Sequence, residues 1–118
     1  MYGLPPDQDF GFLIGVTLTQ ICIGRHEIIL NFSGDVSITV EGDLEIEPTL
    51  ATRHRYDDSR VAGAKLSPLV ALSVENARRI QPGDLELTFS NGWAVNICDS
   101  SSHYESYQIR HGSDLFVI

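Results

Sequence analysis

Alternation of apolar and polar positions is the feature that most limits what this chain can fold into. In residues 27–32 the apolar positions 28, 30 and 32 share one face of an extended strand. A Ser33-Gly34-Asp35 turn follows, and positions 36, 38 and 40 then repeat the alternation. The pattern predicts a β-hairpin with one buried face.

The same hairpin design returns in the second half of the chain. The alternating segments 85–89 and 93–97 flank Ser90-Asn91-Gly92, and Asn-Gly is among the strongest short hairpin signals. An offset of 57 positions aligns the two hairpins without a gap, and the segment before each hairpin recurs at an offset of 56. We predict two related three-stranded meanders, in halves of about residues 13–47 and 69–110, with chance alternation of β-rich segments as the alternative.

The remaining chain adds strands and turns to this frame. Strands are predicted at residues 43–47, 105–110 and 114–118, and the polar residues 48–60 are predicted to form a loop. Ser67-Pro68 is typical of an N-cap followed by a first-turn proline, so one short helical turn is expected there. We expect residues 1–118 to form a single mainly β domain, a sandwich or partly closed barrel of about eight to nine antiparallel strands with at most one short helix.

The charge balance limits the classes of partner. Sixteen Asp and Glu oppose eight Lys and Arg, so the formal net charge is −8. Nucleic acids and anionic membranes attract basic surfaces, so neither is expected as a partner. The charge favours a protein with a basic surface, or serves solubility alone. We expect a cytoplasmic protein, because no apolar run reaches the roughly 18–20 residues of a membrane helix and no signal-peptide pattern opens the sequence.

Few residue combinations point to chemistry. Two pairs offer a zinc-type ligand set: Cys22 with His26, and Cys98 with His103. No Cys-x2-Cys pair occurs and Cys22 has apolar neighbours, so we expect two reduced, structural cysteines. Asp99, His103 and the serines between them have the residue types of a hydrolase triad, but without a Gly-x-Ser-x-Gly elbow a serine-rich turn explains them. We expect no enzyme activity, metal or cofactor.

A run of alternating acidic residues is the main candidate for partner binding. Its members are Glu41, Asp43, Glu45 and Glu47. In a continuous strand these carboxylates would lie about 6.6 Å apart on the outer face, a spacing that resembles nucleic-acid phosphates and could engage a basic nuclease groove. Alternatively, Gly42-Asp43 forms a turn that leaves only Glu45 and Glu47 aligned, or the charges protect a sheet edge.

Other candidates lie in a loop and in a late strand. The segment His54-Arg55-Tyr56-Asp57-Asp58 could hold a cation or a general acid/base pair, although such residues are usually just solvated in loops. We include Asp57 and Asp58 among the partner-binding candidates. Tyr104 and Tyr107 are added because aromatic side chains anchor interfaces, and only one should be exposed because they lie on opposite strand faces. Trp93 is expected in the core.

Several motifs together span most of the chain. Residues 83–92 read Gly-Asp-Leu-x-Leu-x-Phe-Ser-Asn-Gly and lead through Asp99 into Tyr-Glu-Ser-Tyr-Gln-Ile at residues 104–109. Residues 37–42 read Ser-Ile-Thr-Val-Glu-Gly, whereas no acidic-Gly turn follows them. The pattern resembles an uncharacterised family of small bacterial proteins. This resemblance implies a β fold, and related-looking small acidic proteins are proposed as immunity proteins, inhibitory partners in bacterial toxin neighbourhoods.

These observations favour a non-enzymatic protein-binding module, an immunity-type inhibitor that covers a basic toxin or nuclease with its acidic surface. Two alternatives stay open: a homo-oligomeric structural or scaffold domain, and a small-molecule binder with a pocket inside the barrel or around residues 54–58. Function should lie where the two halves differ, which means residues 41–47, 52–60 and 100–107.

Overall fold

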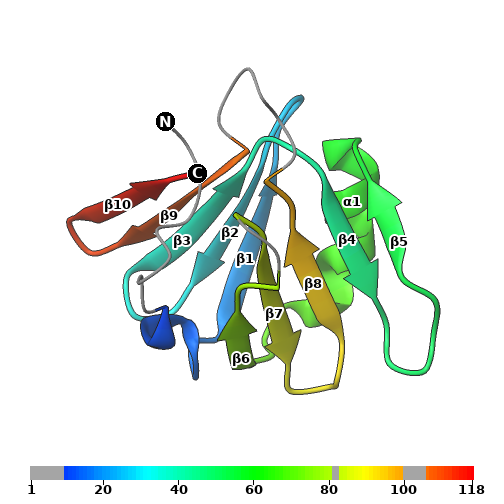
Figure 1. The fold of residues 1–118 in the computed structure, drawn as a ribbon, viewed down its shortest axis with the longest axis horizontal. Coiled ribbons are helices and arrows are strands. Elements are labelled where there is room, and N and C mark those ends of the chain that lie inside the picture. The colour runs from blue at the N-terminus through cyan, green and yellow to red at the C-terminus, as the bar shows by residue number, and fades with distance from the viewer. Residues whose placement is uncertain (1–9, 81–82, 100–105) are drawn as a thin grey trace.

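The computed structural model describes residues 10–80, 83–99 and 106–118, and these form a β-sandwich of two five-stranded antiparallel sheets (Figure 1). The first sheet has the order β1-β2-β3-β9-β10, with strands Leu18–Ile23, Ile28–Phe32, Val36–Val40, Tyr107–His111 and Asp114–Val117. The second has the order β5-β4-β8-β7-β6, with strands His54–Tyr56, Leu44–Glu47, Ala94–Ile97, Leu85–Phe89 and Val74–Arg78. The prediction of a mainly β, antiparallel sandwich is confirmed, with ten strands in the described residues and no closed barrel.

The two predicted meanders form, and each lies in its own sheet. β1-β2-β3 belongs to the first sheet and β6-β7-β8 to the second. After β3 the chain crosses to the second sheet, where β4 pairs with β8. After β8 it crosses back, and β9 pairs with β3. Each sheet therefore consists of one meander and of the hairpin that follows the other meander in the sequence.

Corresponding positions of the meanders share local geometry. Both first strands carry a β-bulge, between Leu18 and Gln20 in β1 and between Val74 and Asn76 in β6. A 3-10 turn precedes each, η1 (Gly11–Leu13) and η2 (Ser67–Leu69). The residues two positions after these turns, Gly15 and Ala71, both have positive φ, 93° and 78°. Alanine in this region is strained by about 1–2 kcal/mol, so Ala71 is held there by its surroundings.

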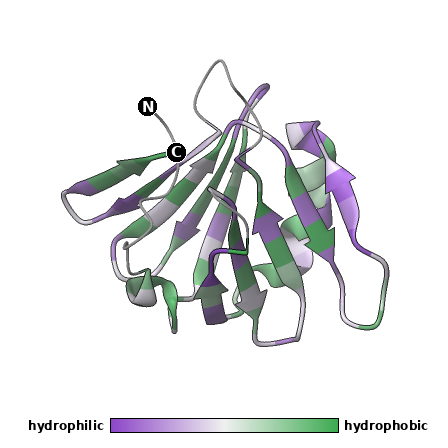
Figure 2. Cartoon of the chain, in the orientation of Figure 1, coloured by the Kyte–Doolittle hydropathy of each residue, from purple (hydrophilic) through white to green (hydrophobic). Residues whose placement is uncertain are grey.

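The core lies between the sheets and follows the alternation. In β2 and β3 the first, third and fifth residues of each strand are buried. Hydrophobic and hydrophilic residues alternate along the strands in Figure 2. Each fully buried Leu or Ile contributes about 1.5–3 kcal/mol to folding relative to an exposed position. Trp93, which was expected in the core, is only partly buried and packs against it.

The predicted loop at residues 48–60 is wrong in two places, because it contains β5 and the start of helix α1 (Ser59–Leu66). Asp58 caps the helix, since its Oδ1 accepts the Arg60 N–H at 2.9 Å. Gly63 lets α1 approach β1, because a Cβ there would lie 2.5 Å from the Ile23 side chain. The helix therefore depends on tertiary contact more than on its own sequence pattern. The predicted helical turn near Ser67 is the 3-10 turn η2.

Candidate functional site

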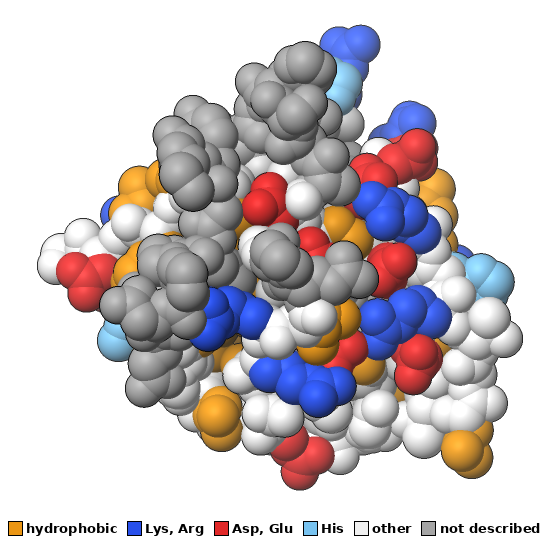
Figure 3. Space-filling view, in the orientation of Figure 1, with side chains coloured by type: hydrophobic (Ala, Val, Ile, Leu, Met, Phe, Trp, Pro, Cys, Tyr) orange, Lys and Arg blue, Asp and Glu red, His pale blue; other side chains and the backbone are white. Residues whose placement is uncertain are grey.

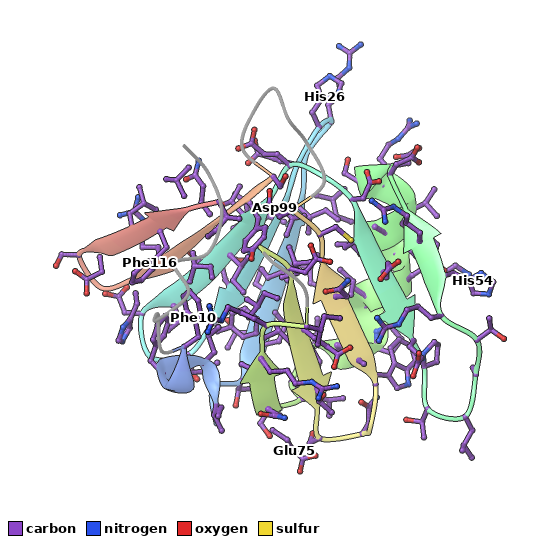
Figure 4. The ribbon with its side chains drawn as sticks, in the orientation of Figure 1. Phe10, His26, His54, Glu75, Asp99 and Phe116 are labelled. Atoms are coloured by element: carbon purple, nitrogen blue, oxygen red, sulfur yellow. The ribbon has the colours of Figure 1, made fainter. Side chains whose placement is uncertain are left out.

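A groove of about 930 Å³ opens at the end of the sandwich where β3 passes to β4. Three segments surround it: the β1–β2 turn, the β3–β4 crossover, and the junction of β5 with α1. His26, on the β1–β2 turn, marks this end of the molecule in Figure 4. We call this hollow the crossover groove.

The crossover groove has an apolar floor and a charged rim. Ile28, Val40, Leu44 and Ala62 are buried core residues that also line the groove. The rim carries Arg25, His26, Glu41, Asp57, Asp58 and Arg60. Counting histidine as neutral, the rim holds two cations and three carboxylates, which gives 2 − 3 = −1. An apolar floor with a few polar groups around it is the usual composition of a binding site.

Hydrogen bonds hold the rim together. Ser59 Oγ donates to the carbonyl of Gly24 at 2.6 Å and lies 3.1 Å from that of Arg25, so the start of α1 is tied to the β1–β2 turn. Asp58 pairs with the Arg60 guanidinium at 3.2 Å. The side-chain hydrogen bond from Arg60, followed by its backbone N–H, lowers the pKa of Asp58. Asp58 is therefore charged at neutral pH and engaged within the chain, whereas Asp57 is exposed.

A second polar cluster covers the outer face of the second sheet. We call it the arginine lattice; its members are Asp43, Glu45, Glu47, Arg53, Arg55, Arg78 and Glu86. Figure 3 shows blue and red side chains interleaved over this face. The side chains come from β4 and the residue before it, β5 and the residue before it, β6 and β7. Ten residues separate Glu45 from its partner Arg55 across the hairpin.

Arg53 lies at the centre of the arginine lattice. Its guanidinium contacts Glu86 at 2.7 Å, Glu47 at 3.1 Å and Glu45 at 3.5 Å. Arg55 binds Asp43 at 2.8 Å and lies 3.8 Å from Glu45. Asp43, Glu45 and Glu47 of the predicted acidic ladder are thus neutralised within the chain.

Glu86 is the most buried charge of the arginine lattice, with a side chain only 7% exposed. Burial alone would raise its pKa, but hydrogen bonds from Arg53 and Arg78 outweigh burial and lower the pKa. The carboxylate therefore stays ionised beneath two arginines. Removing either partner would leave a buried charge less compensated.

A buried amide extends this network. Asn96 Nδ2 donates to Glu45 at 2.9 Å and to Asp84 at 3.1 Å. Asp84 also accepts the backbone N–H of Asp99 at 2.8 Å. Asn96 Oδ1 is buried and has no hydrogen-bond partner among the described residues. These contacts connect β4, β7 and β8, so they stabilise the second sheet.

The predicted partner-binding residues fall into three groups: those at the crossover groove, those in the arginine lattice, and the two tyrosines described in the next paragraph. Glu41, Asp57 and Asp58 lie together at the crossover groove, although Glu41 is far from the loop residues in sequence. Because β3 ends at Val40 and β4 begins at Leu44, Glu41 and Asp43 lie in the crossover and not in one continuous strand. Asp43, Glu45 and Glu47 belong to the arginine lattice.

The structure describes only one of the two predicted aromatic anchors, Tyr107. Tyr107 is fully buried, and its hydroxyl donates to the Gly83 carbonyl at 2.5 Å, so this side chain is part of the core and not of an exposed interface. Burial raises its pKa, which keeps the phenol neutral. Tyr104 lies outside the described residues, as do His103 and the serines of the 100–102 turn.

The described residues that were considered for chemistry provide neither a metal-binding group nor an activated thiol. Burial raises the pKa of the Cys98 thiol to about 11, so it is protonated at neutral pH and a poor nucleophile. Both cysteines are free. In the described parts of the chain, no three His, Cys, Asp or Glu side chains form a group that could hold a metal ion. His54 is exposed and points away from the molecule in Figure 4.

Sequence reasoning did not single out Arg25 or Arg53 as site residues, and it considered His26 only as a zinc-type ligand together with Cys22. One signal for Arg53 was present: Arg53 and Arg55 alternate in the same way as Glu45 and Glu47, as opposite strands of a charged hairpin would. No sequence signal placed Arg25 and His26 at a groove, because the groove exists only once β4 has crossed to the other sheet.

The helices in the described residues are too short and too polar to cross a membrane. No curated protein and no solved structure shows significant similarity to the chain. A model of a family of unknown function, DUF6188, matches residues 12–118, which include both meanders and both exchanged hairpins. The chain therefore belongs to this family of unknown function, DUF6188.

Proposed function

We propose that this chain is a non-enzymatic protein-binding module that receives a basic segment of its partner in the crossover groove. The proposal depends on one observation: the crossover groove combines an apolar floor with carboxylates from two separate segments, Glu41 and Asp57. Apolar contact would supply affinity, and the carboxylates would select a basic segment and speed its approach.

The arginine lattice is a weaker candidate for the same role. A basic partner would have to displace Arg53 and Arg55 from carboxylates that they already contact at 2.7–3.8 Å. At the rim of the groove, Asp57 is exposed and forms no ion pair with the described residues. The net charge of −8 adds long-range attraction for a basic protein.

In its finer form, the proposal makes the chain an immunity-type inhibitor that covers the basic active site of a toxin or nuclease. The family resemblance and the charge of the chain support this form. It predicts a toxin gene beside the gene for this chain, and one-to-one inhibition of the purified toxin that weakens as salt rises. If the chain does not inhibit the product of the neighbouring gene, the immunity form is rejected and the binding module is left.

A small-molecule binder is the second candidate, because the groove lies beside residues 54–58 and its size falls within the common range for ligand pockets, about 300–1,000 Å³. A thermal-shift screen distinguishes the two. A metabolite that raises the melting temperature in the wild type, but not in a groove variant, would favour this candidate over a protein partner.

The protein-binding proposal is tested with short blocked peptides and nuclear magnetic resonance. We expect the basic peptide RKLKR to shift the backbone amides of Gly24 and Gly42, and its charge-reversed counterpart EDLDE to leave them unchanged. Asp57→Lys should weaken binding by about two- to five-fold, as one rim charge is worth at most about 1 kcal/mol.

Glu75→Lys is the matched control, because Glu75 is exposed and lies at the opposite end of the molecule from His26 (Figure 4). It makes the same change of net charge far from the groove. Equal weakening by both substitutions would mean that only net charge matters, and would overturn the assignment of the site to the groove.

A further inference from the structure

The two halves differ at the position that forms the base of the crossover groove. In the first sheet Val40 pairs with Tyr107, and in the second sheet Ile97 pairs with Leu44. Val40 and Ile97 are matched by the offset of 57. Leu44 and Tyr107 therefore occupy corresponding places, each opposite the end of a meander's third strand.

Tyr107 fills its place completely. Its ring is fully buried, and its hydroxyl reaches the carbonyl of Gly83, which lies just before β7 in the connection from β6. The side chain thus extends from β9 to the connection between the first two strands of the second meander.

Leu44 is too short to make the corresponding contact. Its side chain ends at Cδ, three bonds before the position of a tyrosine hydroxyl oxygen, and the matching connection is the β1–β2 turn. Leu44 and the turn residues Gly24 and His26 all line the crossover groove. The groove therefore occupies the place that the Tyr107 ring fills in the other half.

We propose that the crossover groove receives a tyrosine side chain presented by a basic segment of a partner protein. The ring would lie against the exposed side chain of Ile23, above the buried Val40 and Leu44, with its hydroxyl toward the β1–β2 turn. The rim, with its net charge of −1, complements basic residues on either side of that tyrosine. This inference rests on the proposed function and names the side chain that the groove selects.

The first test compares two peptides that differ only at the central residue. We expect RKYKR to bind about five- to ten-fold more tightly than RKLKR, with the largest shifts at Gly24 and Gly42. N-acetyl-L-tyrosinamide should bind at the same amides, more weakly than RKYKR by at least about ten-fold, because it lacks the basic flanks. Equal affinity of the two peptides, or shifts outside the groove, would overturn the inference.

The second test fills the groove from within. Leu44→Tyr should fold, because the corresponding place accommodates a tyrosine, and should reduce binding of RKYKR by at least about ten-fold. Leu44→Met is the matched control, since it stays apolar and lengthens the side chain without adding a ring, and should keep the affinity within about two-fold. If Leu44→Met folds and Leu44→Tyr does not, the place has no room for a phenol and the inference is wrong.

The reciprocal variant gives an independent check on the correspondence. Tyr107→Leu should open a second hollow near Gly83, and p-cresol should raise the melting temperature of this variant more than that of Tyr107→Phe, which keeps the ring. No difference between the two variants would contradict the match between the two places.

The outcomes separate the inference from the proposed function. If RKLKR and RKYKR bind equally at the groove, the binding module stands and tyrosine selection fails. If N-acetyl-L-tyrosinamide binds at the groove but neither basic peptide binds more tightly, the aromatic pocket stands and the basic protein partner fails.

Discussion

The chain carries its carboxylates in two settings that differ in how each negative charge is balanced. In the arginine lattice, Arg53 and Arg55 lie within 3.8 Å of four carboxylates on the outer face of the second sheet. At the crossover groove, Asp58 pairs with Arg60 while Asp57 is exposed beside an apolar floor. Carboxylates are thus held in ion pairs in one region, whereas in the other region one of them, Asp57, is exposed.

The difference comes from burial and from the number of contacts per charge. Glu86 is nearly enclosed and receives hydrogen bonds from two arginines, so its loss disturbs several groups at once. Asp57 lies on an exposed rim where water screens its charge. Substitutions in the arginine lattice should therefore change stability, and substitutions at the rim should change binding.

Arg53→Met should have the largest effect on stability. It removes the guanidinium contacts to Glu45, Glu47 and Glu86 and leaves a nearly buried carboxylate with Arg78 alone. We expect the free energy of unfolding to fall by about 2–4 kcal/mol in urea denaturation at neutral pH. A loss below about 0.5 kcal/mol would show that the lattice is only a solvated surface.

Glu86→Gln should come next, with a loss of about 1.5–3 kcal/mol, because it keeps the shape and removes the negative charge that accepts three hydrogen bonds from Arg53 and Arg78. It also tests the pH dependence. The folded-state pKa of Glu86 lies below its ordinary value of 4.5, so its stabilisation is present above that pH and is lost as pH falls through the folded-state pKa. The Gln variant should lose less stability than wild type between pH 5 and the acid transition; parallel curves would contradict the assignment.

Arg55→Met should have a smaller effect than Arg53→Met. Arg55 is 48% exposed, against 28% for Arg53, and its one short contact is to Asp43. We expect a loss of about 0.5–1 kcal/mol, measured in the same urea series. Equal losses for the two arginines would mean that the contact between Arg53 and the buried Glu86 adds no stability beyond that of an exposed ion pair.

Asp57→Asn should change stability least, by no more than about 0.5 kcal/mol, because an exposed rim carboxylate has no ion pair to lose within the described residues. The same variant should weaken binding of the basic peptide. A large loss of stability with unchanged binding would reverse the comparison between the two regions.

Much of the fold was predictable because it depends on local alternation. Strands β2, β3, β7 and β8 follow the pattern of apolar positions, and the predicted turns lie between β2 and β3 and between β7 and β8. β5 was missed because three residues with charged and aromatic side chains carry no alternation signal of their own. α1 was missed because Gly63 weakens helix propensity and is explained only by its contact with Ile23.

The candidate site was less predictable than the fold. The acidic run at residues 41–47 was visible in the sequence. Asp43, Glu45 and Glu47 are neutralised by Arg53 and Arg55, whose positions could not be predicted because residues 48–60 were assigned to a loop. The groove brings Glu41 beside Asp57 only because β4 leaves the sheet of β3. The predicted duplication of the chain remains a prediction about its origin, although corresponding bulges and turns are present.

The exchange of hairpins between the sheets has a consequence for assembly. Neither half contains a finished sheet, because the meander of each requires the hairpin that follows the other. A separated half would present a vacant strand position on its meander and a hairpin without a sheet. Two identical half-chains hold both complementary parts, so such fragments would be prone to strand-swapped dimers, and the intact chain avoids this by satisfying each vacancy internally.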